Sequence, residues 1–254
     1  MEPAEYERMA RLEDGHWWYR ALRRLVLRSV HASLPVGRKP RILDAGCGTG
    51  GSLAALAKSV PEAVIIGADV AQPAMTHAAA RAAGHLVYGS VNRLPFRDAA
   101  FDLVLCADLL YIEGVDDRLA LGEIRRVLRD DGTLIVNVAA FEVLRGAHDD
   151  AVHTRHRYRR NELERLLAAQ GFAVKRLMYW NALLCPAVFL VRRVFRPGRA
   201  RSQAGSDLVG IPGVLNWLLE QLLTLDGWLC SRVRMPFGTS LFTVASKRVA
   251  EAAA

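Results

Sequence analysis

A chain of 254 residues with 52% hydrophobic and 24% charged residues is long enough for one sizeable core and too apolar for a disordered protein. Its 34 lysines and arginines exceed its 26 acidic residues by eight. This excess is local, because residues 153–201 hold twelve basic and two acidic side chains. The rest of the chain is close to neutral, which disfavours a nucleic-acid-binding protein.

The four cysteines, at positions 47, 106, 185 and 230, show neither paired spacing nor histidine partners at ligand spacing. We therefore expect no disulfide framework and no metal site. No apolar run reaches the roughly 18 residues that span a bilayer, and the N-terminus lacks the apolar core of a signal peptide. We expect a cytoplasmic protein, with peripheral contact at the inner membrane face as an alternative.

Short apolar runs alternate with helical patterns, which is typical of a parallel sheet covered by helices. Asn161 is the predicted N-cap of the last core helix, Gly171 is its predicted end, and Asp130-Asp131-Gly132 is a predicted turn. The predicted helices are 16–32, 51–59, 72–83, 118–128 and 161–170. The predicted strands are 41–45, 63–69, 85–88, 101–107, 133–139, 172–179 and 240–246.

The segment between the last two strands, 180–237, is too long for a hairpin. It combines an apolar run at 183–194, an arginine cluster at 192–201 and a leucine-rich helical pattern with two tryptophans at 214–233. This mixture favours peripheral membrane contact or a lipid-binding cap, while a cap packed on the sheet and a homodimer interface are alternatives. We expect one domain, consisting of an N-terminal lid (1–38), a core (39–179), this cap (180–237) and a last strand with a tail (238–254).

A glycine-rich run at 42–51 joins the first strand to the first core helix. Gly46 and Gly48 open a GxGxxG spacing that is typical of dinucleotide-binding loops. Asp44 argues against a dinucleotide, because a carboxylate beside this loop would repel a pyrophosphate and attract an ammonium or a sulfonium. Asp69, which ends the second strand, suits ribose hydroxyls. The two acids together favour a cationic nucleoside, S-adenosylmethionine (SAM).

The motif ILDAGCGTG at 42–50 resembles the first motif of class I SAM-dependent methyltransferases, and of their type 11-like bacterial subgroup that acts on small molecules or lipids. The similarity continues through Asp69, LPF at 94–96, FDLVLCAD at 101–108 and EIRRVLRDDG at 123–132. This resemblance implies a Rossmann-like α/β fold with a mostly parallel seven-stranded sheet in the order 3-2-1-4-5-7-6. The helical lid would precede that sheet, and the helical insertion would lie between its strands 6 and 7.

The resemblance also implies which residues contact SAM. Asp44 and the backbone of the glycine loop would face the methionine part, Asp69 would bind the ribose, and Val70 would pack on the adenine. Ser90 stands where relatives often carry an acid that binds the adenine amino group. The expected cofactor-binding set is Asp44, Gly46, Cys47, Gly48, Gly50, Asp69, Val70, Ser90, Val91, Cys106 and Ala107.

Two segments are candidates for the acceptor side. HWWYR at 16–20 resembles an N-terminal segment of the same subgroup, and its tryptophans either contact the acceptor or pack in the core. The polar segment at 148–160 follows the fifth strand, at the sheet edge where ligands bind, and resembles an HxRRY-type segment. The candidate bases are His153, His156 and Asp108. The candidate acceptor residues are Trp17, Trp18, Arg155, Arg157 and Tyr158, with the two arginines holding an anionic head group.

The sequence thus predicts a SAM-dependent methyltransferase that acts on an oxygen or carbon atom of a small or lipid-like hydrophobic acceptor. One alternative is a catalytically idle SAM-binding or membrane-interaction module. A second alternative is an NAD-dependent oxidoreductase, against which Asp44 and the lack of a Tyr-x-x-x-Lys pair argue.

Overall fold

The computed structural model describes residues 2–81, 83–195 and 210–248. Its centre is one seven-stranded sheet in the order β3-β2-β1-β4-β5-β7-β6, which confirms the predicted topology. Strand β7 is antiparallel to both of its neighbours, and the other pairs are parallel. The strands are β1 (Arg41–Ala45), β2 (Val64–Asp69), β3 (His85–Tyr88), β4 (Phe101–Ala107), β5 (Leu128–Ala139), β6 (Phe172–Trp180) and β7 (Ser240–Lys247).

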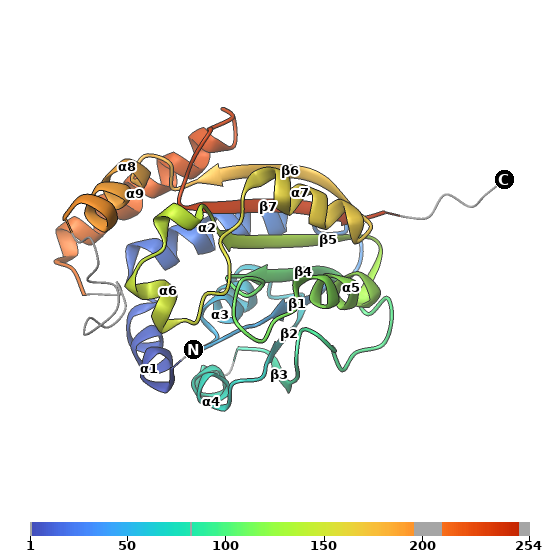
Figure 1. The fold of residues 1–254 in the computed structure, drawn as a ribbon. Coiled ribbons are helices and arrows are strands. Elements are labelled where there is room, and N and C mark those ends of the chain that lie inside the picture. The colour runs from blue at the N-terminus through green and yellow to red at the C-terminus, as the bar shows by residue number, and fades with distance from the viewer. Residues whose placement is uncertain (1, 82, 196–209, 249–254) are drawn as a thin grey trace.

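Helices lie on both faces of the sheet and at the edge where the parallel strands end (Figure 1). The core helices are α2 (Trp17–His31), α3 (Gly51–Ser59), α4 (Gln72–Ala80), α5 (Asp117–Val127) and α7 (Arg160–Ala169). The helices near the carboxyl ends of the strands are α1 (Pro3–Leu12), the short 3-10 helix η1 (Glu142–Leu144), α6 (Ala147–Ala151), α8 (Cys185–Leu190), the π-helical turn η2 (Val191–Phe195) and α9 (Gly213–Cys230).

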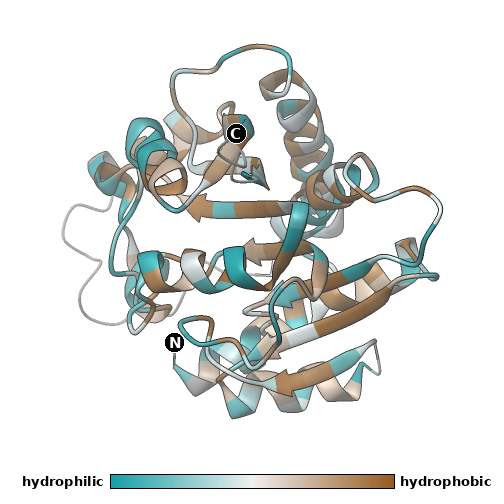
Figure 2. Ribbon diagram, turned by 90° about the vertical axis from the view of Figure 1, so that its right-hand side faces the viewer, coloured by the Kyte–Doolittle hydropathy of each residue, from teal (hydrophilic) through white to brown (hydrophobic). Residues whose placement is uncertain are grey.

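The central strands are apolar on both faces, as Figure 2 shows by their mostly brown colour. Side chains alternate between the two faces. Leu43 and Val104 pack in one buried cluster with residues of α5 and α7, whereas Ile42 and Leu103 pack in another with residues of α2, α3 and α9. Both faces are therefore covered, which explains why the strand sequences are continuous apolar runs.

Three details differ from the sequence-based predictions. Helix α7 begins at Arg160 and has no side-chain cap, so Asn161 lies inside the helix and is not its N-cap. Residues 130–132 belong to β5 and form no separate turn; Asp131 has a φ of 61°, and the register with β4 shifts beside it. Helix α1 was not expected as a separate element, although Pro3 at its first position is a helix-start signal.

A buried carboxylate ties helix α9 of the insertion between β6 and β7 to the turn that follows β6. Asp226 of α9 is fully buried and accepts hydrogen bonds from the N–H groups of Asn181 (2.6 Å), Ala182 (2.9 Å) and Leu183 (2.8 Å). These N–H groups directly precede α8, so Asp226 joins the two helices of the insertion. Residues 196–209, including Arg196, Arg199 and Arg201 of the predicted arginine cluster, lie outside the described residues.

No helix in the described ranges is long and apolar enough to cross a membrane.

Replacing Asp226 tests this fastening. Asp226→Ala leaves three buried N–H groups without an acceptor, so we expect the free energy of unfolding to fall by about 3 kcal/mol. Urea denaturation followed by circular dichroism measures this change. Gln221→Ala, at an exposed position on the same helix, serves as the control and should change stability by less than about 0.5 kcal/mol. Equal stability of the two variants would contradict the assigned role.

Candidate functional site

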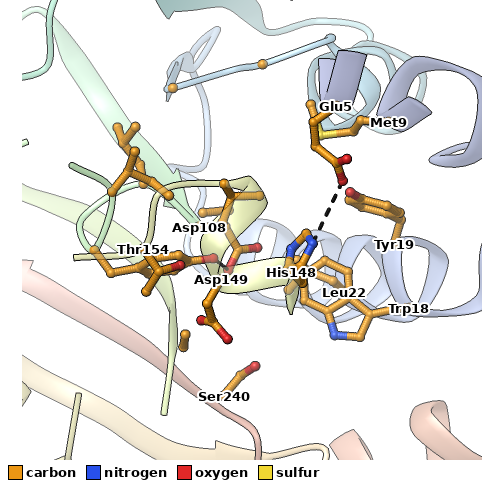
Figure 3. A pocket seen from close by; sticks show the side chains of 18 of the residues that line it. Glu5, Met9, Trp18, Tyr19, Leu22, Asp108, His148, Asp149, Thr154 and Ser240 are labelled. Carbon is orange, nitrogen blue, oxygen red and sulfur yellow. Dashed lines mark hydrogen bonds and ion pairs between the residues drawn. The ribbon is translucent and has the colours of Figure 1, made fainter. Parts of the chain in front are cut away.

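A cavity of about 1400 Å³ lies at the carboxyl ends of β1, β2 and β4, and side chains of α1, α2, α6 and α8 also line it. Parallel sheets bind ligands at this edge, because the loops after the strands diverge there. Figure 3 shows side chains from α1 and α2 facing those of α6 and of the loop after β4 across the cavity. Its volume exceeds the roughly 300–1,000 Å³ of a site for one small ligand, so it has room for two molecules.

The glycine loop after β1 lines the side of this cavity that is next to the sheet. Gly46, Gly48 and Gly50 have φ values of 77°, 53° and 87°, a region that side chains disfavour. A Cβ atom on Gly46 would lie 2.7 Å from a methyl carbon of Leu109. Glycine is therefore favoured at position 46 by its dihedral angle, and a side chain there would also have to displace the Leu109 side chain.

Asp44 is the buried charge of this site. Its side chain is 2% exposed, lines the cavity, and carries a carboxylate oxygen, Oδ2, without a hydrogen-bond partner. Burial, followed by the charges of Asp69 and Glu13, raises the pKa of Asp44 to about 7. A buried carboxylate without a partner is costly, and a cationic ligand in the cavity would supply the missing partner.

Asp69 lies beside the same loop at the end of β2. Its two oxygens accept hydrogen bonds from the backbone N–H groups of Gly48 and Ala71, each at 2.9 Å. Both oxygens keep free lone pairs on the cavity side. Val70, which is 51% exposed, and Ser90 and Val91 line the neighbouring wall. The expected ribose and adenine contacts thus come together in one place.

Helix α1, a separate helix within the predicted N-terminal lid (1–38), covers the glycine loop. Glu13, at the end of α1, accepts hydrogen bonds from Thr49 Oγ1 and Arg81, both at 2.6 Å. Met9 lies against Gly48, since its methyl carbon would be 3.1 Å from a Cβ atom built there. The side chains of α1 that line the cavity are Glu5, Tyr6 and Met9.

Aromatic side chains of α2 close the cavity on one side. Trp17 and Trp18 both line it, as expected for acceptor residues. The Trp18 ring also packs edge-on against Tyr19 at 5.1 Å and lies 6.1 Å from the ring of Trp180. Since both tryptophans line the cavity and pack on neighbouring rings, the two roles considered for them are compatible.

Asp108 follows β4 and is the candidate base that lines the cavity. Its Oδ1 accepts hydrogen bonds from Tyr111 Oη (3.0 Å) and Asn137 Nδ2 (2.9 Å), and Trp180 Nε1 in turn donates to Asn137 Oδ1 (2.8 Å). Burial raises the pKa of Asp108 to about 6, against the opposing hydrogen bonds and the charge of Arg157. The second oxygen, Oδ2, has no hydrogen bond in the described structure and is available to a ligand.

Arg157 lines the cavity, but its guanidinium is already used by the protein. It pairs with the buried Asp149 at 2.6 Å and donates to the carbonyl oxygens of Ala140 (3.0 Å), Phe141 (3.1 Å) and Thr239 (3.3 Å). The expectation that Arg157 holds an anionic head group is therefore not supported by its contacts.

Four further acceptor-side candidates lie outside the cavity lining. His153 faces solvent 3.8 Å from Glu113, and His156 contacts Glu162 at 2.6 Å. Arg155 pairs with Asp117 at 3.2 Å, and Tyr158 is buried with its hydroxyl donating to the same carboxylate at 2.7 Å. The structure therefore corrects the interpretation of these four residues, because the chain turns back at Tyr158 to join the core.

Two expected cofactor residues also lie away from the cavity. Cys106 is fully buried in the cluster with α5 and α7, since alternate residues of β4 point to opposite faces. Gly50 is the N-cap of α3 and does not line the cavity. The remaining expected residues, Cys47 and Ala107, do line it. Within the described part of the chain, no group of three or more acidic, histidine or cysteine side chains could hold a metal ion.

Comparison with known proteins shows which proteins this site resembles. Residues 42–132 match the family model described as a methyltransferase domain. A malonyl-[acyl-carrier protein] O-methyltransferase of Herminiimonas arsenicoxydans is 36% identical over 37% of this chain and 35% of its own length. A protein of the same name from Geobacter sulfurreducens is 33% identical over 61% of this chain and 64% of its own length. The chain therefore spans less than two thirds of either relative.

A solved structure shows the same fold over nearly the whole chain. It is a SAM-dependent methyltransferase from Thermotoga maritima, 18% identical, with a TM-score of 0.57 over 96% of both chains. The matched segment 42–132 contains the glycine loop, Asp69 and Asp108, and the sheet has the strand order that the resemblance implied. Residues 42–132 therefore match a methyltransferase domain, and the fold of the chain is that of a solved SAM-dependent methyltransferase.

Proposed function

We propose that the protein transfers a methyl group from SAM to an oxygen or carbon atom of a small or lipid-like hydrophobic acceptor. The observation that carries this proposal is the buried carboxylate oxygen of Asp44, which has no partner and lies beside the glycine loop in a cavity with room for two molecules. SAM carries an ammonium and a sulfonium group, and either would supply the cationic partner that this oxygen lacks.

The residues around the glycine loop suit the parts of SAM. Asp44 and the backbone of Gly46 and Gly48 would hold the methionine part. Asp69 would receive the ribose hydroxyls, and Val70, with half of its surface exposed, would pack on the adenine. Ser90 offers a hydroxyl on the adenine side, but that oxygen already accepts from Asn92 N–H at 3.2 Å.

When bound, SAM supplies a methyl group on a positively charged sulfur, which a nucleophile displaces in line. The protein's share of this reaction is to align the two molecules and to exclude water. Trp17, Trp18 and Tyr19 form the apolar side of the cavity that would do so. Asp108 would accept the proton of the acceptor through Oδ2, while Tyr111 and Asn137 hold Oδ1 in place.

The wall opposite the glycine loop supports a hydrophobic acceptor. Its apolar side chains from α8, η2 and α9 are Leu184, Ala187, Val188, Val191 and Leu219, and Arg192 and Arg193 of η2 line the cavity beside them. The two relatives named above are O-methyltransferases by name, which supports an oxygen atom as the methyl acceptor. The family match leaves the oxidoreductase alternative without support.

Incubation with isotopically labelled SAM and fractions of a cell extract tests the proposed activity. Transfer of label to an extractable small or lipid-like compound is the expected result. Binding of SAM without transfer to any fraction would favour the catalytically idle alternative.

Substitution of Asp44 tests the cofactor site. Asp44→Asn removes the negative charge, so we expect SAM affinity to fall by about 10- to 100-fold in calorimetry. The fold should be no less stable, because the substitution also removes a buried carboxylate without a partner. Asp98→Asn, at a side chain that is 78% exposed, is the matched control and should bind SAM normally. Unchanged affinity in Asp44→Asn would refute the role of Asp44.

The raised pKa of Asp44 predicts a pH dependence. The free carboxyl is half protonated near pH 7, and a bound cation favours its ionised form. Below that pH, binding must therefore release a proton, and SAM affinity should rise as the pH increases through about 7 and then level off. Calorimetry in buffers of different ionisation enthalpy measures the released proton. A flat affinity profile in the wild-type protein would contradict this prediction.

Substitution of Asp108 tests the proposed base. Asp108→Asn should slow methyl transfer by about 10²- to 10⁴-fold and leave SAM affinity nearly unchanged. In the wild-type protein the rate should rise with pH through about 6, where Asp108 ionises. Tyr111→Phe removes a hydrogen bond that lowers the pKa of Asp108, so this rise should move to higher pH. A loss of SAM binding in Asp108→Asn, or an unmoved profile in Tyr111→Phe, would count against the assignment.

A further inference from the structure

Helix α9 exposes several apolar side chains to solvent and buries its two acidic side chains. Its exposed stripe, at a spacing of three or four residues, consists of Val214, Leu218, Gln221, Leu225 and Trp228. Leu218 and Leu225 are 51% and 55% exposed, whereas the charged Glu220 and Asp226 on the opposite side are 1% and 0% exposed. A helix of a soluble domain ordinarily turns its apolar side chains inward, so the outer stripe of α9 is suited to an apolar environment.

The buried acids of α9 have defined partners. Glu220 pairs with Arg20 at 3.0 Å and with Arg24, both on α2, and Asp226 holds the turn before α8. These contacts fix the rotation of α9 about its axis, so that Leu218, Leu225 and Trp228 face outward while Leu223 is buried. The apolar stripe is therefore a consequence of the packing and not of a loosely placed helix.

The exposed apolar surface extends beyond this stripe. It includes Trp217 (57% exposed) and, from α8 and its neighbours, Leu183, Phe189, Leu190 and Val191, which are each 41–46% exposed. We call these residues, together with the stripe of α9, the α8–α9 face. Large exposed apolar side chains gathered on elements that Asp226 holds together are typical of a site of interaction with a membrane or a protein.

The charges beside the α8–α9 face favour a membrane with anionic lipids. Arg232 lies over the ring of Trp228 at 4.0 Å, and Arg193 on η2 is exposed. Within the described part of segment 180–237, both acidic side chains are the buried Glu220 and Asp226. Exposed tryptophans, leucines and arginines without exposed acids are typical of helices that lie in the headgroup region of an anionic bilayer.

The cavity opens on this same face. Val191 both lines the cavity and is 44% exposed, and Arg193 is likewise exposed and lines it. Leu184 and Val188 of the α8 region and Leu219 of α9 continue the apolar wall inward. An amphiphile lying in the bilayer could thus reach the cavity along apolar side chains without passing through water.

From this juxtaposition we propose that the α8–α9 face docks on the surface of an anionic membrane, and that the acceptor is an amphiphile that enters the cavity from that bilayer. The docking rests on the face alone, whereas the identity of the amphiphile as methyl acceptor rests on the proposed function.

Vesicle flotation of the full chain tests the docking without any turnover. The probes are vesicles of phosphatidylcholine with phosphatidylglycerol and vesicles of phosphatidylcholine alone. Flotation is expected mainly with the anionic vesicles and should decrease with added salt. The double variant Leu218→Ser/Leu225→Ser should lose about tenfold or more of its partitioning. Leu119→Ser on α5, at a side chain that is 57% exposed, is the matched control and should float like the wild type.

Two results would overturn the proposal. One is a monomeric wild-type protein that binds S-adenosylhomocysteine, the demethylated product of SAM, and does not float with anionic vesicles. The other is a dimer in light scattering that the double variant splits into monomers, which would make the α8–α9 face a subunit interface. Calorimetry with S-adenosylhomocysteine on the same samples distinguishes a failure of the docking from a failure of the proposed function. If the proposed function is wrong, the ligand does not bind although the protein floats with the vesicles.

Discussion

The buried carboxylate of Asp44 is the constraint around which the rest of the site is arranged. It sits at the end of β1, 2% exposed, with one oxygen that no protein group satisfies. Its neighbours raise the penalty, because Asp69 and Glu13 are both negative. A buried carboxylate without a partner is costly, and a cationic ligand beside Asp44 and Asp69 would offset that cost. The fold, the glycine loop and the covering helices shield the Asp44 carboxylate from bulk water and leave it accessible to a ligand in the cavity.

A second constraint is that two segments far apart in the sequence, the N-terminal helices and the insertion before β7, together enclose the cavity. Helix α1 lies over the glycine loop through Glu13 and Met9, while the insertion before β7 supplies the opposite apolar wall. Asn216 of α9 links these parts, since it accepts from Trp17 N–H at 2.9 Å and donates to the Gly15 carbonyl at 2.8 Å. The side of the cavity near the glycine loop is thus polar and acidic, and the side formed by the insertion is largely apolar, which suits the proposed transfer from a cation to a hydrophobic molecule.

The sheet and the glycine loop were predictable because local sequence decides them. Apolar runs such as 101–107 have no alternative to a buried strand, and φ values above zero select glycines at 46 and 48. The loop after β5 was not predictable in the same way. His153 and His156 do not line the cavity and contact Glu113 and Glu162 instead, whereas Asp149 and Arg157, eight residues apart, pair at the cavity wall. Such pairings of side chains leave no recognisable pattern in the sequence. Some arginines of the basic segment 153–201 also make contacts within the protein. Arg157 and Arg160, for example, donate hydrogen bonds to backbone carbonyl oxygens.

A crystal structure of the protein with S-adenosylhomocysteine would locate the cofactor site. We expect the amino group of the ligand within hydrogen-bonding distance of Asp44, the ribose hydroxyls on Asp69 and the adenine against Val70. We also expect the sulfur to point toward Asp108 and the apolar wall of α8. A ligand bound elsewhere, or one bound in the cavity that leaves the Asp44 oxygen without a partner, would contradict this expectation.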